Sequence, residues 1–297
     1  MEKKQINGTG VALVTPFKSD FSIDFKALEA ITRNVVQGGV DFIVALGTTG
    51  EASLLDLEEK LKVVDTIKKV VDGRIPIVMG YGGNNTQEMI NGFKKYDFTG
   101  IDAILTVTPF YVKPSQEGLF QHYKAVADAS PRPLILYNVP GRTGVNMEAS
   151  TTLRLAHHPN IIGIKEASGK LFQIEDIMMR KHKDFLLFSG DDALTYHLVN
   201  LGADGVISVT ANAYPKEIST LVNNLKEGNP LYPLQIHNGM KELTKAVFAD
   251  GNPSGIKFVL HRLGRCENVL RLPLVPVKRQ VEEELDRCLR EFSIHLP

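Results

Sequence analysis

The sequence predicts a (β/α)₈ barrel, the TIM-barrel fold, with a helical C-terminal extension. Short apolar segments alternate with amphipathic segments about eight times before residue 214, which is the pattern of a parallel barrel. A length of 297 residues suits one such barrel. No glycine-rich nucleotide-binding motif follows the first apolar segment, and this argues against a doubly wound sheet.

The predicted strands are short runs of apolar and β-branched residues, as expected for strands buried on both faces of a parallel sheet. They cover residues 8–17, 41–47, 75–80, 103–109, 133–139, 161–167, 185–189 and 205–209. Active sites of such barrels are built at the C-terminal ends of the strands, so these ends are the places to search for chemistry.

Helical periodicity fills the intervals between the strands. The predicted barrel helices cover residues 24–37, 56–71, 86–96, 116–129, 147–156, 172–181 and 194–201. Helical patterns without strand signals then follow at 217–226, 231–247, 256–263 and 281–292. We therefore predict a catalytic barrel over residues 1–214 and a helical region over 215–297 that packs on it.

Composition limits the classes of partner. Lys and Arg together number 34 and so do Asp and Glu, so no charge excess indicates nucleic acid or an acidic membrane surface. We expect a small-molecule substrate. Cys266 and Cys288 form neither a disulfide framework nor a metal-binding spacing. Without a signal peptide or a segment of transmembrane length, the sequence predicts a cytoplasmic protein.

The segment 161–169 reads IIGIKEASG and places Lys165 near the end of a predicted buried strand. Burial disfavours the ammonium form, lowers the pKa and makes a neutral amine available near neutral pH. A neutral amine can attack a carbonyl and form a Schiff base. The alternative is a lysine whose stem is buried while its head reaches solvent.

Other predicted strands end in polar residues. The ends read GTTGE at 47–51, TPFY at 108–111, YNVPGRTG at 137–144 and SGDD at 189–192. Each can be an ordinary turn, packing tyrosine or helix cap. Taken together, they predict hydroxyl groups and the guanidinium of Arg142 around the same barrel end as Lys165. This is the set of groups that a Schiff-base aldolase needs.

Three of these motifs, GTTGE, YNVPGRTG and GIKEASG, resemble the dihydrodipicolinate synthase family. The family belongs to the pyruvate-dependent class I aldolases, together with N-acetylneuraminate lyase. The resemblance extends from GTGVALVTPF to NPSGIKFVLHRLG and LRLPLVPV, nearly the whole chain. It implies a lyase and a homotetramer built as a dimer of dimers, with a dimer as the open alternative.

The resemblance implies a role for each motif residue. Lys165 would form the Schiff base, with Tyr137 beside it as proton donor and acceptor. Thr49 and Tyr111 would complete a proton relay, with Tyr111 supplied by the neighbouring subunit. Thr48 and Thr49 would bind the carboxylate of pyruvate.

The remaining implied roles concern substrate binding. Arg142 would hold the carboxylate of the second substrate, and Gly190 and Ile207 would line the pyruvate pocket. The implied reaction joins pyruvate to L-aspartate 4-semialdehyde and gives 4-hydroxy-tetrahydrodipicolinate, the first committed step of diaminopimelate and lysine biosynthesis. No metal or organic cofactor is implied, since pyruvate is itself bound covalently as an imine.

Two alternatives stay open at this point. A sibling lyase acting on N-acetylneuraminate or a keto-deoxy sugar acid would share the lysine and the tyrosine, although Arg142 and the SGDD motif favour the synthase. A catalytically silent barrel is the alternative from another class, because fold alone does not imply activity. The presence of both Lys165 and Tyr137 argues against it.

The expected pocket for feedback inhibition by lysine is only partly present. Asn84 and Glu88 fit the inhibited members of the family. Leu57 and Lys60 stand where those members have histidines, and Phe110 stands where they have a tyrosine. Because the Lys60 cation would repel a cationic effector, we predict weak or absent inhibition by lysine.

Overall fold

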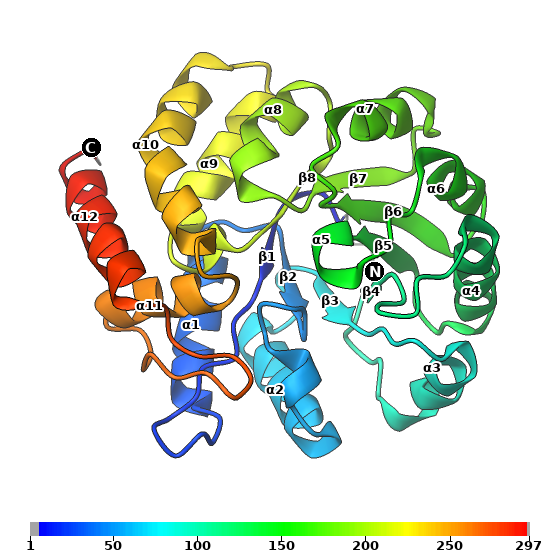
Figure 1. Cartoon of the computed structure of the whole chain (residues 1–297), viewed down its shortest axis with the longest axis horizontal. Helices are drawn as coiled ribbons and strands as arrows, with labels where there is room; N and C mark the ends of the chain where they lie inside the picture. The colour runs from blue at the N-terminus through cyan, green and yellow to red at the C-terminus, as the bar shows by residue number, and fades with distance from the viewer. Residues whose placement is uncertain (1–5, 296–297) are drawn as a thin grey trace.

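The computed structural model describes residues 6–295, and within them eight parallel strands form a closed barrel in chain order (Figure 1). The barrel closes because β8 pairs with β1, with Gly8 opposite Gly205. The strands are β1 (Gly8–Ala12), β2 (Phe42–Ala45), β3 (Ile77–Gly80), β4 (Ala103–Val107), β5 (Leu134–Asn138), β6 (Ile161–Glu166), β7 (Leu186–Ser189) and β8 (Gly205–Ser208). The predicted barrel is confirmed.

Helices follow the strands and surround the barrel (Figure 1). They are α1 (Phe25–Gln37), α2 (Leu57–Val71), α3 (Thr86–Gly92), α4 (Gln116–Ala129), α5 (Pro140–Thr143), α6 (Ala149–Ala156), α7 (Leu171–Arg180), α8 (Thr195–Asn200), α9 (Pro215–Lys226), α10 (Leu231–Phe248), α11 (Ser254–Arg262) and α12 (Arg279–His295). Each predicted helix is present within a few residues of its expected bounds. Asp24 caps α1 as predicted, since its side chain accepts from the Ala27 amide.

Two segments differ from the sequence-based expectation. The first strand ends at Ala12, and residues 13–17 continue as irregular backbone. Helix α5 forms where a loop was expected: Pro140 starts it with its fixed φ, and Gly144 ends it at a φ of 74°. One helical turn is too short to show periodicity in the sequence.

The alternation of side chains along the strands separates two apolar layers. Phe42, Phe188 and Ile207 lie in the cluster that fills the barrel, where the rings of Phe42 and Phe188 meet edge to face at 5.3 Å. Ile164 lies in the outer cluster between strands and helices. Because successive residues of a strand point to opposite faces, Lys165 points into the barrel.

The C-terminal helices pack in sequence on one side of the barrel. Helix α9 contacts β1 and α8, α10 contacts α9, and α12 contacts α10 (Figure 1, yellow to red). The predicted division between residues 214 and 215 stays a prediction. Among the described residues, no helix has both the length and the apolar character that crossing a membrane requires.

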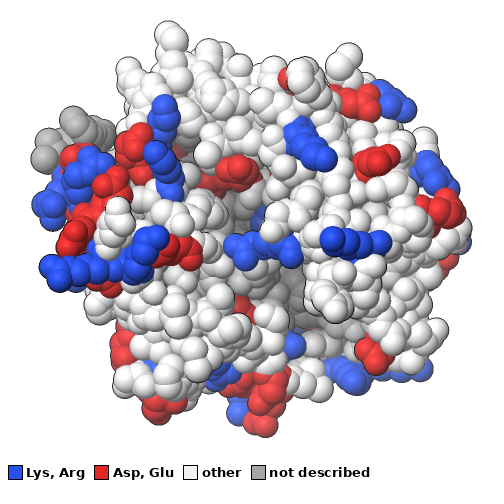
Figure 2. Space-filling model, in the orientation of Figure 1, with Lys and Arg blue, Asp and Glu red and all other residues white. Residues whose placement is uncertain are grey.

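Charged side chains of both signs are interspersed on the face shown in Figure 2, in keeping with a formal net charge of zero. The same face is hollowed near its centre, and Lys or Arg side chains lie at the edge of the hollow.

Candidate active site

Lys165 is the buried amine that the sequence predicts. It lies next to the last residue of β6 and is only 5% exposed, so its head does not reach solvent. Burial lowers the pKa of Lys165 to about 8, with the Asp192 carboxylate opposing the shift and the Arg142 guanidinium adding to it. Roughly a tenth of the amine is then neutral at pH 7.

Tyr137 is the nearest aromatic neighbour on the adjoining strand. It pairs in register with Lys165 across β5 and β6, and the lysine Nζ lies 4.5 Å from the ring centroid. Burial raises the pKa of Tyr137, although Arg142 and a hydrogen bond with the Thr48 side chain oppose the shift. The phenol is therefore protonated near neutral pH and able to donate.

The two threonines of the GTTGE loop have different environments. Thr48 is exposed and its side chain opposes the rise in the pKa of Tyr137, whereas Thr49 is 2% exposed and its Oγ1 accepts a hydrogen bond of 2.9 Å from Asn252 Nδ2. A place for Thr49 in the relay stays a prediction. The effect on the pKa of Tyr137 favours the first threonine, Thr48, as the neighbour of the phenol.

Arg142 lies in α5 and is exposed at the surface. One of its Nη2 hydrogens is donated to the main-chain oxygen of Asn252, at 3.3 Å. Its charge lowers the pKa of both Lys165 and Tyr137. The structure thus brings this guanidinium close to the two central side chains, as the loop position after β5 predicts.

Gly190 and Ile207 contribute space and an apolar wall. A Cβ at Gly190 would lie 3.1 Å from both Cγ and Cε of Lys165 and 2.7 Å from Cβ of Ala167. The glycine therefore leaves room for the lysine stem. Ile207 is 1% exposed and belongs to the same interior cluster as Tyr137.

Tyr111 is not brought into the site of its own chain. Its residue is 87% exposed, and its φ of 70° turns the backbone so that its amide donates to Thr143 O at 3.0 Å. A side chain in this position can serve a site only after another molecule approaches it.

The residues of the expected lysine pocket lie in α2, in α3 and in the loops before α3 and after β4. Asn84 Oδ1 accepts from the Phe110 amide at 2.8 Å, and Glu88 is exposed in the first turn of α3. Leu57 begins α2 and is 41% exposed, and Lys60 follows one turn later. An effector role for this region stays a prediction.

Asp192 does more than cap a helix, and this further role was not predicted from the sequence. Its residue is 9% exposed, and Oδ2 accepts 2.9 Å hydrogen bonds from the Val209 amide and from both the amide and the hydroxyl of Thr210. It therefore fixes the loop after β8 while its charge acts on Lys165. The SGDD motif drew attention to Asp192, but the sequence did not show that its carboxylate binds the loop after β8.

Glu166 and Asn252 were also missed. Burial raises the pKa of the Glu166 carboxyl, which accepts from the Asn138 side chain at 3.0 Å and from the Ser168 amide at 2.7 Å. The bond from Asn138 ties the ends of β5 and β6 together, one residue after the paired Tyr137 and Lys165. Asn252 belongs to the NPSG stretch, which the resemblance covers without assigning it a role.

Named relatives cover nearly the full chain. The chain is 49% identical to 4-hydroxy-tetrahydrodipicolinate synthase from Parabacteroides distasonis, over 97% of this chain and 98% of that one. The enzyme of the same name from Phocaeicola vulgatus is 48% identical over 99% of both chains.

Solved structures agree with these relatives. The chloride-inhibited dihydrodipicolinate synthase from Acinetobacter baumannii, complexed with pyruvate, superposes with a TM-score of 0.94 at 43% identity, covering 98% of this chain and 100% of that one. A sequence model of the dihydrodipicolinate synthetase family matches residues 5–292. The chain belongs to the dihydrodipicolinate synthetase family, whose members are lyases.

Proposed function

We propose that this chain is a 4-hydroxy-tetrahydrodipicolinate synthase that condenses pyruvate with L-aspartate 4-semialdehyde. The observation that carries the proposal is a buried lysine with a lowered pKa, in register with a buried tyrosine and within reach of an arginine charge. Relatives of this name and the pyruvate complex of the Acinetobacter enzyme support the choice of substrate. A sibling sugar-acid lyase is not favoured.

The first stage forms an imine. Neutral Nζ of Lys165 attacks the ketone carbon of pyruvate, and the carbinolamine loses water. Loss of a methyl proton then gives the enamine, which is the carbon nucleophile. We assign binding of the pyruvate carboxylate to the hydroxyls of Thr48 and Thr49, and Gly190 leaves space beside the lysine stem.

Proton transfer in these steps is assigned to Tyr137. Because the Thr48 side chain opposes the rise in the pKa of Tyr137, we place Thr48 rather than Thr49 next to Tyr137 in the relay. A neutral phenol can donate to the departing hydroxyl and regain a proton through the threonine. Tyr111 of a neighbouring subunit would extend the relay to solvent.

The second stage uses the aldehyde. Arg142 is suited to bind the carboxylate of L-aspartate 4-semialdehyde, because a guanidinium can pair with both carboxylate oxygens. The enamine carbon bonds the aldehyde carbon, whose oxygen takes a proton. The amine of the semialdehyde then attacks the imine carbon and displaces Lys165, which closes the ring. No metal or organic cofactor is required in this scheme.

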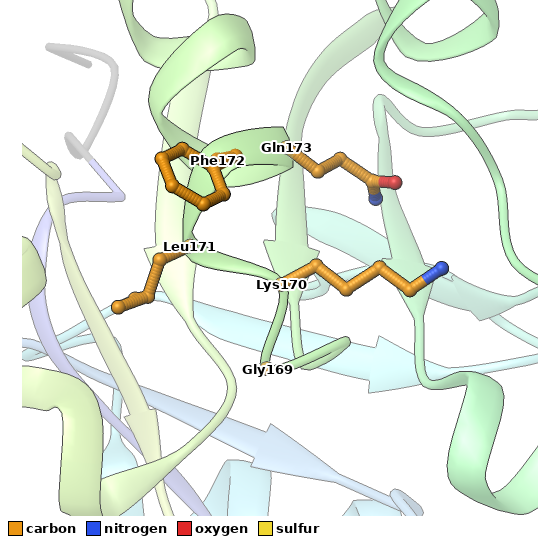
Figure 3. A pocket seen from close by; sticks show the side chains of 5 residues that line it. All are labelled: Gly169, Lys170, Leu171, Phe172 and Gln173. Atoms are coloured by element: carbon orange, nitrogen blue, oxygen red, sulfur yellow. The ribbon is translucent and has the colours of Figure 1, made fainter.

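We propose a homotetramer, a dimer of dimers, as the assembly. Exposed apolar side chains that are neighbours along the chain or on one helix support it, since apolar patches at a surface mark contact sites. Tyr111 and Val112 form one such place, at 87% and 57% exposure, and Phe172 and Met179 of α7 form another, at 90% and 86%. Figure 3 shows Leu171 and Phe172 directed away from Lys170 and Gln173. A dimer would cover only the exposed side chains of Tyr111 and Val112, and a tetramer would also cover those of α7.

A cytoplasmic location stays part of the proposal. Cys266 and Cys288 are both free thiols in the structure, as is usual in a reducing compartment. The proposal includes neither nucleic acid nor membrane as a partner.

Borohydride trapping tests the function. Wild-type chain incubated with pyruvate and borohydride is expected to gain a reduced pyruvate adduct, and Lys165→Ala is expected to gain none. Lys170→Ala, an exposed lysine nearby, is the matched control and keeps the adduct. Wild-type chain must also consume L-aspartate 4-semialdehyde faster than N-acetylneuraminate. An adduct in Lys165→Ala would reject the assignment of the lysine.

A further inference from the structure

One residue of the C-terminal region contacts both proposed carboxylate-binding elements. Asn252 lies between α10 and α11 and is 8% exposed. Its side-chain Nδ2 donates to Thr49 Oγ1 at 2.9 Å, and its main-chain oxygen accepts from Arg142 at 3.3 Å. The side chain of Asn252 is therefore hydrogen-bonded to the loop after β2, and its main chain is hydrogen-bonded to the helix after β5.

Buried charges anchor the same loop a second time. Glu51, the last residue of GTTGE, forms an ion pair with Lys257 of α11, and both side chains are completely buried. The other Glu51 oxygen accepts from the Arg271 amide at 3.2 Å. Lys257 also donates to Val269 O at 3.0 Å. These contacts join the GTTGE loop to the C-terminal region close to the contact between Asn252 and Thr49.

The side chain of Asn252 is poorly satisfied for a buried amide. Its Oδ1 is buried without a hydrogen-bond partner among the described residues. An unpaired buried acceptor destabilises the fold, and an apolar side chain of similar size would avoid this loss. Stability alone therefore does not favour an asparagine at this position. The hydrogen bond to Thr49 is the contact that requires the amide.

The contact with Asn252 has a direct consequence for Thr49. A hydroxyl carries one hydrogen and two lone pairs, and here Asn252 occupies one lone pair. The Thr49 hydrogen must then point away from the amide. Accepting a hydrogen bond also polarises the O–H group, which makes it a better donor to an anion.

We propose that Asn252 is a positioning residue that orients the Thr49 hydroxyl toward the carboxylate of pyruvate. Through its main chain it also supports Arg142. The C-terminal region thereby contributes to pyruvate affinity through a side chain and to aldehyde binding through the backbone. This inference rests on the proposed function, since it assigns Thr49 to the pyruvate carboxylate.

A double-mutant cycle tests it. Asn252→Ala is expected to raise the KM for pyruvate about tenfold, the loss of one hydrogen bond to a charged ligand, with kcat at saturation within about threefold. The KM for the aldehyde is expected to stay within about twofold, because the main-chain oxygen remains. In a Thr49→Val background, Asn252→Ala is expected to raise the KM for pyruvate by less than about twofold more.

Two variants separate positioning from damage to the fold. Asn252→Asp keeps the shape but places an acceptor against Thr49, so its KM for pyruvate is expected to exceed that of Asn252→Ala. Asn223→Ala, an exposed asparagine of α9, is the matched control and is expected to behave as wild type. Thermal unfolding of each variant shows whether it is folded.

The outcomes are distinguishable from failure of the proposed function. If wild-type chain forms no borohydride adduct with pyruvate, the proposed function fails. If wild type forms the adduct and Asn252→Ala keeps the wild-type KM for pyruvate, only the role of Asn252 is rejected. The role of Asn252 is also rejected if Asn252→Ala raises the KM for pyruvate by the same factor in the wild type and in Thr49→Val. It is rejected as well if Asn252→Ala raises the KM values for pyruvate and for the aldehyde equally.

Discussion

Lys165 and Tyr137 are paired in register on the neighbouring strands β6 and β5, and the amine lies 4.5 Å from the centre of the tyrosine ring. The ring covers one side of the amine and contributes to its burial. It also brings a phenol to the same side of the barrel. This arrangement supports the proposed roles of Lys165 as nucleophile and of Tyr137 as proton donor.

Imine formation should follow the ionisation of Lys165. Because burial lowers the pKa to about 8, the rate with subsaturating pyruvate is expected to rise about tenfold per pH unit below pH 8 and to level off above it. Asp192→Asn removes a charge that raises this pKa, so its midpoint should move to lower pH. Arg142→Met should move it to higher pH. Rapid-quench trapping with borohydride measures the midpoint, and a wild-type midpoint near that of free lysine would contradict the prediction.

The same burial should cost stability. The pKa of Lys165 falls from 10.5 to about 8 on folding, so between these values the unfolded chain binds the proton and the native chain does not. Stability contributed by this group therefore rises with pH across that window and is lowest below pH 8. Lys165→Met keeps the apolar stem and is expected to unfold with about 1–3 kcal/mol more free energy at pH 7.

Urea unfolding at a fixed protein concentration checks this stability difference, because assembly would otherwise change the midpoint. The gap between Lys165→Met and wild type is expected to narrow as the pH approaches 10.5. Lys170→Met, at an exposed lysine, is the control and should show no such pH dependence. A less stable Lys165→Met variant at pH 7 would refute the argument.

The fold was predictable because its signals are local. Each strand is a run of apolar residues and each long helix has a clear period, so the closed barrel followed from their alternation. Helix α5 was missed because Pro140–Thr143 is a single turn. The predicted first strand was too long because residues 13–17 stay buried and mostly apolar after the strand ends at Ala12.

The site was predictable only in part. Lys165, Tyr137 and Arg142 stand in contiguous motifs at strand ends, and the structure brings them together. Whether Thr48 or Thr49 neighbours the phenol of Tyr137 depends on the directions of two adjacent side chains, and no local sequence pattern reveals these directions. Asn252 reaches Thr49 across 203 residues, and such a contact is visible only after the C-terminal region has folded onto the barrel.

Gly190 should tolerate no side chain. A methyl group there would lie 3.1 Å from two atoms of the Lys165 stem and closer still to Ala167. Gly190→Ala is therefore expected to displace the lysine and slow imine formation at least about tenfold, because small misplacement of a reacting group is costly. Gly239→Ala, in α10, meets only Phe292 at 3.9 Å and is the matched control. Equal trapping rates for the two variants would contradict the prediction.

Lysine should inhibit the chain weakly or not at all. Lys60 lies in the first turns of α2, where its cation would repel a cationic effector, and Leu57 offers no hydrogen-bonding side chain. Initial rates are expected to be unchanged from micromolar to millimolar lysine. The double variant Leu57→His with Lys60→His is expected to gain sensitivity. Strong inhibition of the wild type at micromolar lysine would show that lysine binds in another pocket.

Tyr111 should act in the site of a neighbouring subunit. It is 87% exposed in its own chain, so in the proposed relay through Tyr137 and Thr48 the outer member would come from an associated chain. Tyr111→Phe and Lys165→Ala are each expected to be nearly inactive alone. Mixing the two variants under conditions that exchange subunits is expected to restore about a quarter of wild-type activity, because half the dimers are mixed and each has one intact site. If Tyr111 served its own chain, no mixed dimer would contain an intact site and activity would not return.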